Sequence, residues 1–88
     1  MRVFFLCTAS LVGTVHDAAC IATMDLDAPF SDLITAVCAL LNWREQDWVF
    51  LYDPWAWHVI PPGRTPQSYN LDHNDQVWIY CVPAEANN

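Results

Sequence analysis

The sequence predicts one small domain of the α+β class. Segments rich in β-branched and aromatic residues, which favour the half-buried surface of a sheet, lie on both sides of a single segment with helical periodicity. The chain has 88 residues, of which 55% are hydrophobic and 14% aromatic. This composition argues against disorder and is sufficient for one modest core. Strands that share one helix on one face are typical of the α+β class.

The first twenty residues allow two interpretations. A positive charge followed by an apolar run resembles a secretory signal, but polar residues interrupt the run, and His16 and Asp17 lie beside the cleavage position. Residues 2–9 have the composition of a strand, and Gly13 suits a turn before a second strand at 18–26. We therefore expect a β-hairpin here.

Residues 27–43 carry the signals of a helix. Pro29 suits the first turn, Ser31 or Asp27 can cap it, and apolar residues recur at helical spacing. The other expected elements are a strand at 47–53, a short strand and turn within 55–65, and a last strand at 76–82. The domain is predicted to span residues 1–83, with residues 84–88 as a disordered polar tail.

This order of elements predicts the β-grasp fold. In that fold a mixed sheet of four or five strands packs on one α-helix, and the first and last strands lie side by side. The predicted hairpin, helix, strand, short strand and final strand follow the same order.

Charge excludes two classes of partner. The formal net charge is −7, and the chain has three arginines and no lysine. Nucleic acids and anionic membrane surfaces both attract basic proteins, so we expect neither as a partner. No apolar run approaches the roughly 20 residues that span a bilayer.

The four cysteines indicate whether the protein belongs to a reducing or an oxidising compartment. They form no CxxC pair. A disulfide framework is open in principle, but each cysteine lies in an apolar stretch, as a small buried hydrophobe does. We expect buried free thiols and an intracellular location, nuclear or cytoplasmic. The four are Cys7, Cys20, Cys38 and Cys81.

No motif indicates catalysis, a cofactor or a metal. His16 and His58 have no cysteine or serine partner at meaningful spacing, so the chain is not expected to be an enzyme. The segment LDHND contains Asp72, His73 and Asp75, but turns favour these residue types without any chemistry.

Two segments resemble the ubiquitin-like superfamily, and most closely its small ubiquitin-like modifier (SUMO-like) domains. They are GRTPQSYNL at 63–71 and APFSDLITAVCALLNW at 28–43, and the resemblance extends over residues 1–82. It implies a β-grasp fold and a docking turn at Asp72 and Asp75. It also implies a peptide groove between the second strand and the helix, although Thr23, Asp25 and Thr35 stand where the family has a basic rim.

The end of the chain departs from the family. Conjugated members end in Gly-Gly, whereas this sequence ends in CVPAEANN. We therefore expect a non-covalent interaction domain, part of a larger protein, that binds another protein such as a ubiquitin- or SUMO-pathway component. Two alternatives stay open: a homodimerisation module that uses the same surface, and a modifier whose Gly-Gly tail lies outside this sequence.

Strand alternation predicts the binding surface. One parity places Val3, Phe5, Cys7, Ala22, Met24, Trp48, Phe50, Tyr52, Val77, Ile79 and Cys81 in the core. The other parity leaves an apolar face, which the chain's own loops could cover or a protein could bind. By the resemblance, Leu51 and Trp78 stand at recognition positions of ubiquitin. The predicted partner-binding residues are Phe4, Leu6, Val49, Leu51, Trp78 and Tyr80.

Overall fold

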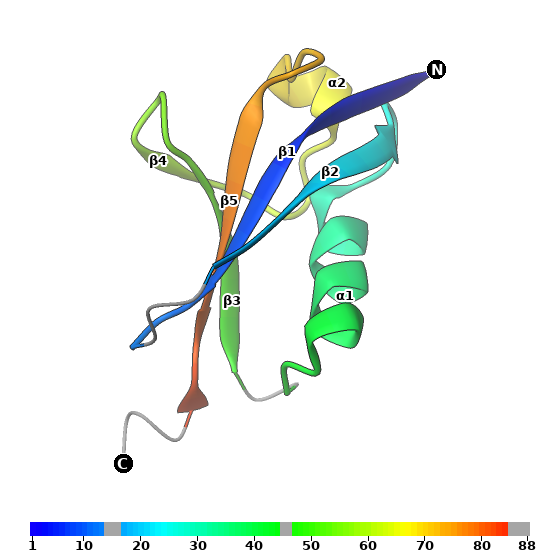
Figure 1. Ribbon diagram of the computed structural model, residues 1–88. Coiled ribbons are helices and arrows are strands. Elements are labelled where there is room, and N and C mark those ends of the chain that lie inside the picture. The colour runs from blue at the N-terminus through cyan, green and yellow to red at the C-terminus, as the bar shows by residue number, and fades with distance from the viewer. Residues whose placement is uncertain (14–16, 45–46, 85–88) are drawn as a thin grey trace.

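The structure, a computed structural model, describes residues 1–13, 17–44 and 47–84. It is a small α+β domain with a five-stranded mixed sheet and two helices (Figure 1). The elements in chain order are β1 (Arg2–Leu11), β2 (Asp17–Asp25), α1 (Phe30–Leu41), β3 (Trp48–Asp53), β4 (His58–Ile60), α2 (Pro66–Tyr69) and β5 (Gln76–Val82).

The strands lie in the order β2-β1-β5-β3-β4. The first and last strands, β1 and β5, are parallel neighbours in the interior of the sheet, and the other neighbouring pairs are antiparallel. Helix α1 lies against one face of this sheet, and α2 lies near one end of it (Figure 1). The opposite face, called the outer face below, carries no helix of the described chain.

Both helices have clear boundaries. The N-cap of α1 is Pro29, which has no capping side chain, so the expected cap from Ser31 or Asp27 is wrong. Helix α2 was not predicted, because four residues are too few for periodicity. It begins with a reciprocal capping box, in which Thr65 and Ser68 each accept a hydrogen bond from the other's backbone N–H.

The core lies between α1 and the sheet. Phe30, Leu33 and Val37 on α1 meet inward residues of all five strands and of the loop before β5. The buried residues of the sheet and loops are Val3, Phe5, Cys7, Ala9, Met24, Leu51, Ile60, Leu71, Val77, Ile79 and Cys81. The inward parity predicted for β1, β2 and β5 is therefore confirmed.

The parity predicted for β3 is wrong. Leu51, expected on the surface, is 0% exposed, and Val49 is half-buried against the core. Leu51 lies directly opposite Ile79 of β5 and Ile60 of β4, and directly opposite residues share a face of the sheet. Because Ile79 points to the helix, Leu51 does as well. Trp48, Phe50 and Tyr52, expected in the core, consequently lie on the outer face.

The first residue of the predicted tail, Ala84, makes a contact with the described chain. Its backbone N–H donates a hydrogen bond of 3.0 Å to Oδ1 of Asp47, and the domain boundary at residue 83 stays a prediction. Residues 85–88, the rest of the predicted tail, lie outside the described residues, as does His16.

The four cysteines are free thiols in different environments. Cys7 and Cys81 are buried and Cys38 is half-buried, but Cys20 is exposed on edge strand β2, so its predicted burial is wrong. Burial, followed by the neighbouring Cys20, raises the pKa of the Cys7 thiol to about 12. Burial, followed by Asp47, raises the pKa of Cys81 to about 11.

We expect the native protein to react with iodoacetamide at Cys20 first and at Cys7 and Cys81 far more slowly. The thiolate is the reactive species, and the raised pKa values leave little of it at the two buried sites. Peptide mass spectrometry over a time course, in buffer and in urea, measures this. Equal native rates at Cys7 and Cys20 would contradict the described burial.

Candidate functional site

Five aromatic side chains form a continuous group on the outer face, called the aromatic cluster below. Its members, from β3 and β5, are Trp48, Phe50, Tyr52, Trp78 and Tyr80. The two strands pair so that Phe50 lies opposite Tyr80 and Tyr52 opposite Trp78. The ring centroids are 4.7 Å apart for Trp48–Phe50, 5.4 Å for Phe50–Tyr80, 6.2 Å for Tyr52–Tyr80 and 6.0 Å for Trp78–Tyr80.

These distances are typical of aromatic pairs that stabilise each other. The rings cover one another in part, yet Trp48 remains 64% exposed. Tyr80 lies at the centre, where burial, followed by Tyr52 and Asp17, raises the pKa of its phenol. The cluster thus offers a neutral aromatic surface with hydroxyl groups, the residue types found at the centres of protein interfaces.

The sequence prediction missed Trp48, Phe50 and Tyr52 as surface residues. The available signal was size, since a core closed by one 12-residue helix has little room for three more large rings. Trp78 and Tyr80 lie on the outer face as predicted, in alternation with the buried residues of β5.

Phe4 and Leu6 also point to the outer face, on the neighbouring strand β1. Leu6 pairs with Gln76, whereas Trp78 and Tyr80 pair with the small polar residues Thr8 and Ser10 of β1. Phe4 instead stacks on His73 at 4.1 Å, and its backbone N–H donates to Nδ1 of that histidine at 3.2 Å. Phe4 therefore has an aromatic partner, His73, outside the aromatic cluster, and the binding role predicted for Phe4 and Leu6 stays a prediction.

The segment from Asp72 to Asp75 is a tight turn. A carboxylate oxygen of Asp75 accepts the backbone N–H of Asp72 at 2.8 Å, and Asp72 O accepts the N–H of Asp75. Among the described residues no group of three or more histidines, cysteines or carboxylates could hold a metal ion. The docking role predicted for Asp72 and Asp75 stays a prediction.

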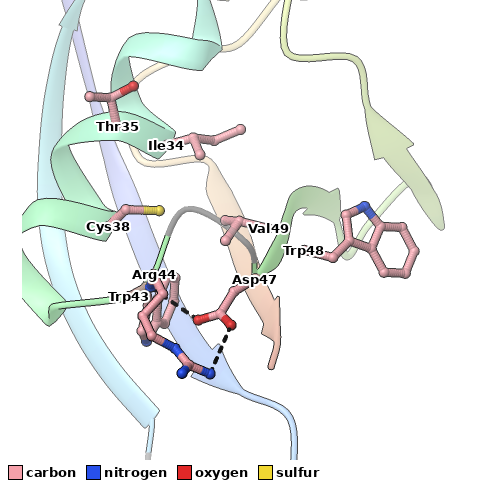
Figure 2. Close-up of a pocket in the computed structure, with 8 residues that line it drawn as sticks. All are labelled: Ile34, Thr35, Cys38, Trp43, Arg44, Asp47, Trp48 and Val49. Atoms are coloured by element: carbon pink, nitrogen blue, oxygen red, sulfur yellow. Dashed lines mark hydrogen bonds and ion pairs between the residues drawn. The ribbon is translucent and has the colours of Figure 1, made fainter. Parts of the chain in front are cut away.

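A cavity of about 430 Å³ lies between α1 and the start of β3. Figure 2 shows Ile34 and Cys38 of α1 pointing toward Val49, while Trp48 points away. Asp47 also lines it, and its carboxylate accepts the backbone N–H groups of Ala84 and Arg44 and pairs with the Arg44 guanidinium at 3.6 Å. These interactions hold the pKa of Asp47 below its ordinary value.

The chemistry of this cavity does not favour nucleophilic catalysis. Burial, followed by Asp47, raises the pKa of Cys38, so its thiol stays protonated at neutral pH. A reactive cysteine needs the opposite environment, one that stabilises the thiolate.

A second groove, of about 220 Å³, lies between β2 and α1. Its floor includes Met24 and Leu33, and its rim carries Asp25 and Asp32. The single cation that lines it, Arg2, pairs with Asp25 at 3.1 Å. The rim is therefore acidic, as expected from the sequence.

A polar network joins the β3–β4 turn to α2. The Tyr69 hydroxyl lies 2.6 Å from Oδ2 of Asp53 and 2.6 Å from Nε2 of His58. Burial, then the Asp53 carboxylate, raises the pKa of Tyr69, so the phenol keeps its proton and donates it to Asp53. Because that proton is used, His58 must donate from Nε2 to the phenol oxygen.

Asp53 is ionised in this network. Partial burial acts to raise the pKa of its carboxyl, but hydrogen bonds from Tyr69 and from the backbone of Ala56 and Trp55, with the nearby His58, outweigh burial. The pKa therefore lies below its ordinary value of 3.8.

We expect Asp53→Asn to lower the free energy of unfolding at pH 6 by about 1 kcal/mol, because a charge-assisted hydrogen bond becomes neutral. A depressed folded-state pKa gives stability that is present above the unfolded value of about 3.9 and lost as pH falls through the folded value. Urea titrations should therefore show that the free energies of unfolding of the unmodified protein and of Asp53→Asn become equal below about pH 4. A difference that stays constant from pH 6 to 2 would contradict the network.

The fold has relatives among solved structures, although no family model and no curated protein matches the chain. Fifty-three chains of solved structures match it. One is a chain of the toluene 4-monooxygenase HD complex with the inhibitor 4-bromobenzoate, with 12% sequence identity and a TM-score of 0.63. The match covers 89% of this chain and 98% of that one, so the two chains share a fold over nearly their whole lengths.

This match corrects the family resemblance. The assignment to the ubiquitin-like superfamily and its SUMO-like domains is wrong: the structural similarity is to a monooxygenase chain, and neither family models nor curated proteins support the assignment. The matched segment GRTPQSYNL contains the capping box and first proline of α2, a local helix-start pattern that unrelated proteins can share. Within the described residues, no helix has the length and apolarity needed to cross a bilayer.

Proposed function

We propose that the protein is a small, non-enzymatic interaction domain that binds another protein through the aromatic cluster. The observation that carries the proposal is five contacting rings on a sheet face that carries no helix of the described chain. The solvent-exposed face of an antiparallel sheet normally carries polar residues. A large exposed apolar patch on such a face usually marks a site of protein binding.

The structural match supports a place in a larger assembly. That chain, which the fold covers almost completely, belongs to a complex. By analogy of fold alone, an accessory chain of a multi-chain assembly, for example of an oxygenase, is a narrower form of the same proposal.

Charge favours a different protein over a second copy. Each copy carries a net charge of −7, so two copies repel, whereas a basic partner is attracted.

We further propose that the strand order is that of the β-grasp fold and that the four thiols belong to a reducing, intracellular compartment.

Site-specific photo-crosslinking tests the proposal. The photoreactive residue p-benzoylphenylalanine replaces Trp78 in the cluster or, as a control, Leu40, which is 75% exposed on α1. We expect irradiation of the native cells to crosslink position 78, but not position 40, to one second protein. A crosslink between two copies would support the homodimer instead. A folded protein without any crosslink from position 78 would overturn the proposal.

A further inference from the structure

A cavity of about 210 Å³ lies where β3 ends and β5 begins. Two aromatic rings and two carboxylates contribute to its lining, together with Gln76 of β5. Asp53 ends β3, Trp55 follows in the next turn, Tyr69 ends α2, and Asp75 immediately precedes β5. Of its lining residues, Asp53 follows Tyr52 in β3, and Gln76 precedes Trp78 by two positions in β5. The cavity therefore lies at the strand ends nearest Tyr52 and Trp78, two members of the aromatic cluster.

The turn that carries Trp55 is held in one conformation. Oδ1 of Asp53 accepts the backbone N–H of Trp55 at 2.9 Å and of Ala56 at 3.1 Å. The backbone N–H of Trp57 donates to Asp53 O at 2.9 Å, and Trp57 has a φ of 60°, unusual for so large a residue. These bonds fix the backbone at Trp55, whose ring lines the cavity and is 74% exposed.

The charge of the cavity is negative. Asp53 is ionised, Tyr69 is neutral, and Asp75 brings a second carboxylate, one oxygen of which accepts the N–H of Asp72. The other carboxylate oxygen of Asp75 makes no hydrogen bond to a described residue and can therefore accept one from a ligand. The guanidinium carbon of Arg64 lies 5.5 Å from the centre of the Tyr69 ring, but Arg64 does not line the cavity.

We propose that this cavity receives an arginine side chain of the protein that binds the aromatic cluster. A guanidinium can lie flat on the Trp55 indole and donate hydrogen bonds toward the carboxylates at the same time. The inference rests on the proposed function, to which it adds the chemistry of the partner: a basic residue at one end of an otherwise apolar contact.

The test uses three short peptides of the form acetyl-Gly-X-Gly-amide, in which X is arginine, lysine or citrulline. NMR titrations of the ¹⁵N-labelled protein follow the Trp55 indole N–H and the Gln76 backbone N–H. We expect the arginine peptide to give saturable shifts with a Kd on the order of millimolar, since one side chain supplies the contact. Citrulline has the same shape without the charge, and its peptide should bind at least tenfold more weakly.

Matched variants localise the binding. Trp55→Ala and Asp75→Asn should each weaken the affinity for the arginine peptide at least fivefold, as measured from the shift of the Gln76 backbone N–H. Trp57→Ala removes a similarly exposed ring (81%) that does not line the cavity, and Asp27→Asn removes an equal charge elsewhere. Both should bind as the unmodified protein does. The arginine assignment would be overturned if the citrulline or the lysine peptide bound as tightly as the arginine peptide. It would also be overturned if Trp55→Ala bound the arginine peptide as tightly as the unmodified protein does.

The inference and the proposed function can fail separately. If position 78 crosslinks a partner but the arginine peptide gives no saturable shift, the cavity assignment is wrong and the aromatic interface stands. If the peptide binds as expected but position 78 gives no crosslink, the aromatic interface is wrong.

Discussion

Leu51→Ala is expected to lower the free energy of unfolding by about 3 kcal/mol, within the range for truncating a fully buried leucine. Leu51 is 0% exposed and lies between Ile60 and Ile79 on the inward face. Alanine leaves a cavity that the neighbouring strands cannot close. Small domains are stable by only about 5–15 kcal/mol, so this loss is a large part of the total. Urea unfolding followed by circular dichroism measures it.

Phe50→Ala is the matched control for Leu51→Ala. Phe50 is adjacent in β3 but points to the outer face, where its ring contacts Trp48 and Tyr80. Losing two partly exposed aromatic contacts should cost about 2 kcal/mol, at about 1 kcal/mol for each ring pair. If Phe50→Ala destabilised the domain more than Leu51→Ala, the parity of β3 would be the reverse of that described.

Trp78→Glu is expected to weaken binding of the crosslinked partner by at least about 2 kcal/mol, or roughly 30-fold, the usual threshold for an interface anchor. Trp78 contacts Tyr80 and lies opposite Tyr52, so a carboxylate there places an unpaired charge within the aromatic cluster. Calorimetric titration of the purified pair gives the affinity.

The control for Trp78→Glu is Leu40→Glu. It makes the same kind of change at an exposed apolar residue on α1, away from the outer face, and should leave affinity within about twofold. Both variants should keep most of their stability. If Trp78→Glu unfolded the domain while Leu40→Glu did not, the cluster would serve the fold and not a partner.

The sequence alone determined the class of the fold and most of its elements. The α+β class, the initial hairpin, the helix from Phe30 and the last strand are all present. Local signals suffice for these, because composition and periodicity act within one element. The inward residues of β1 and β5 were also predicted correctly: Val3, Phe5 and Cys7 alternate with exposed residues, and β5 alternates in the same way.

The same local signals misled the family assignment. One of the two segments that carried the resemblance, GRTPQSYNL, contains a helix start, where the side chains of Thr65 and Ser68 accept backbone N–H groups of the first turn and its N-cap. Any helix can use this chemistry, so it specifies an element and not a family.

Only the tertiary structure decided which face β3 presents. Both parities of WVFLYD are apolar, so alternation does not choose between them, and a shift of one residue moves every side chain to the other face. The choice follows from pairing: Leu51 lies opposite Ile79, which places Phe50 and Tyr52 beside Tyr80 and Trp78. The Asp53–Tyr69–His58 network and the cavity with Trp55 and Asp75 likewise join residues from separate loops. Their proximity depends on strand order and register, which are long-range properties that no local pattern encodes.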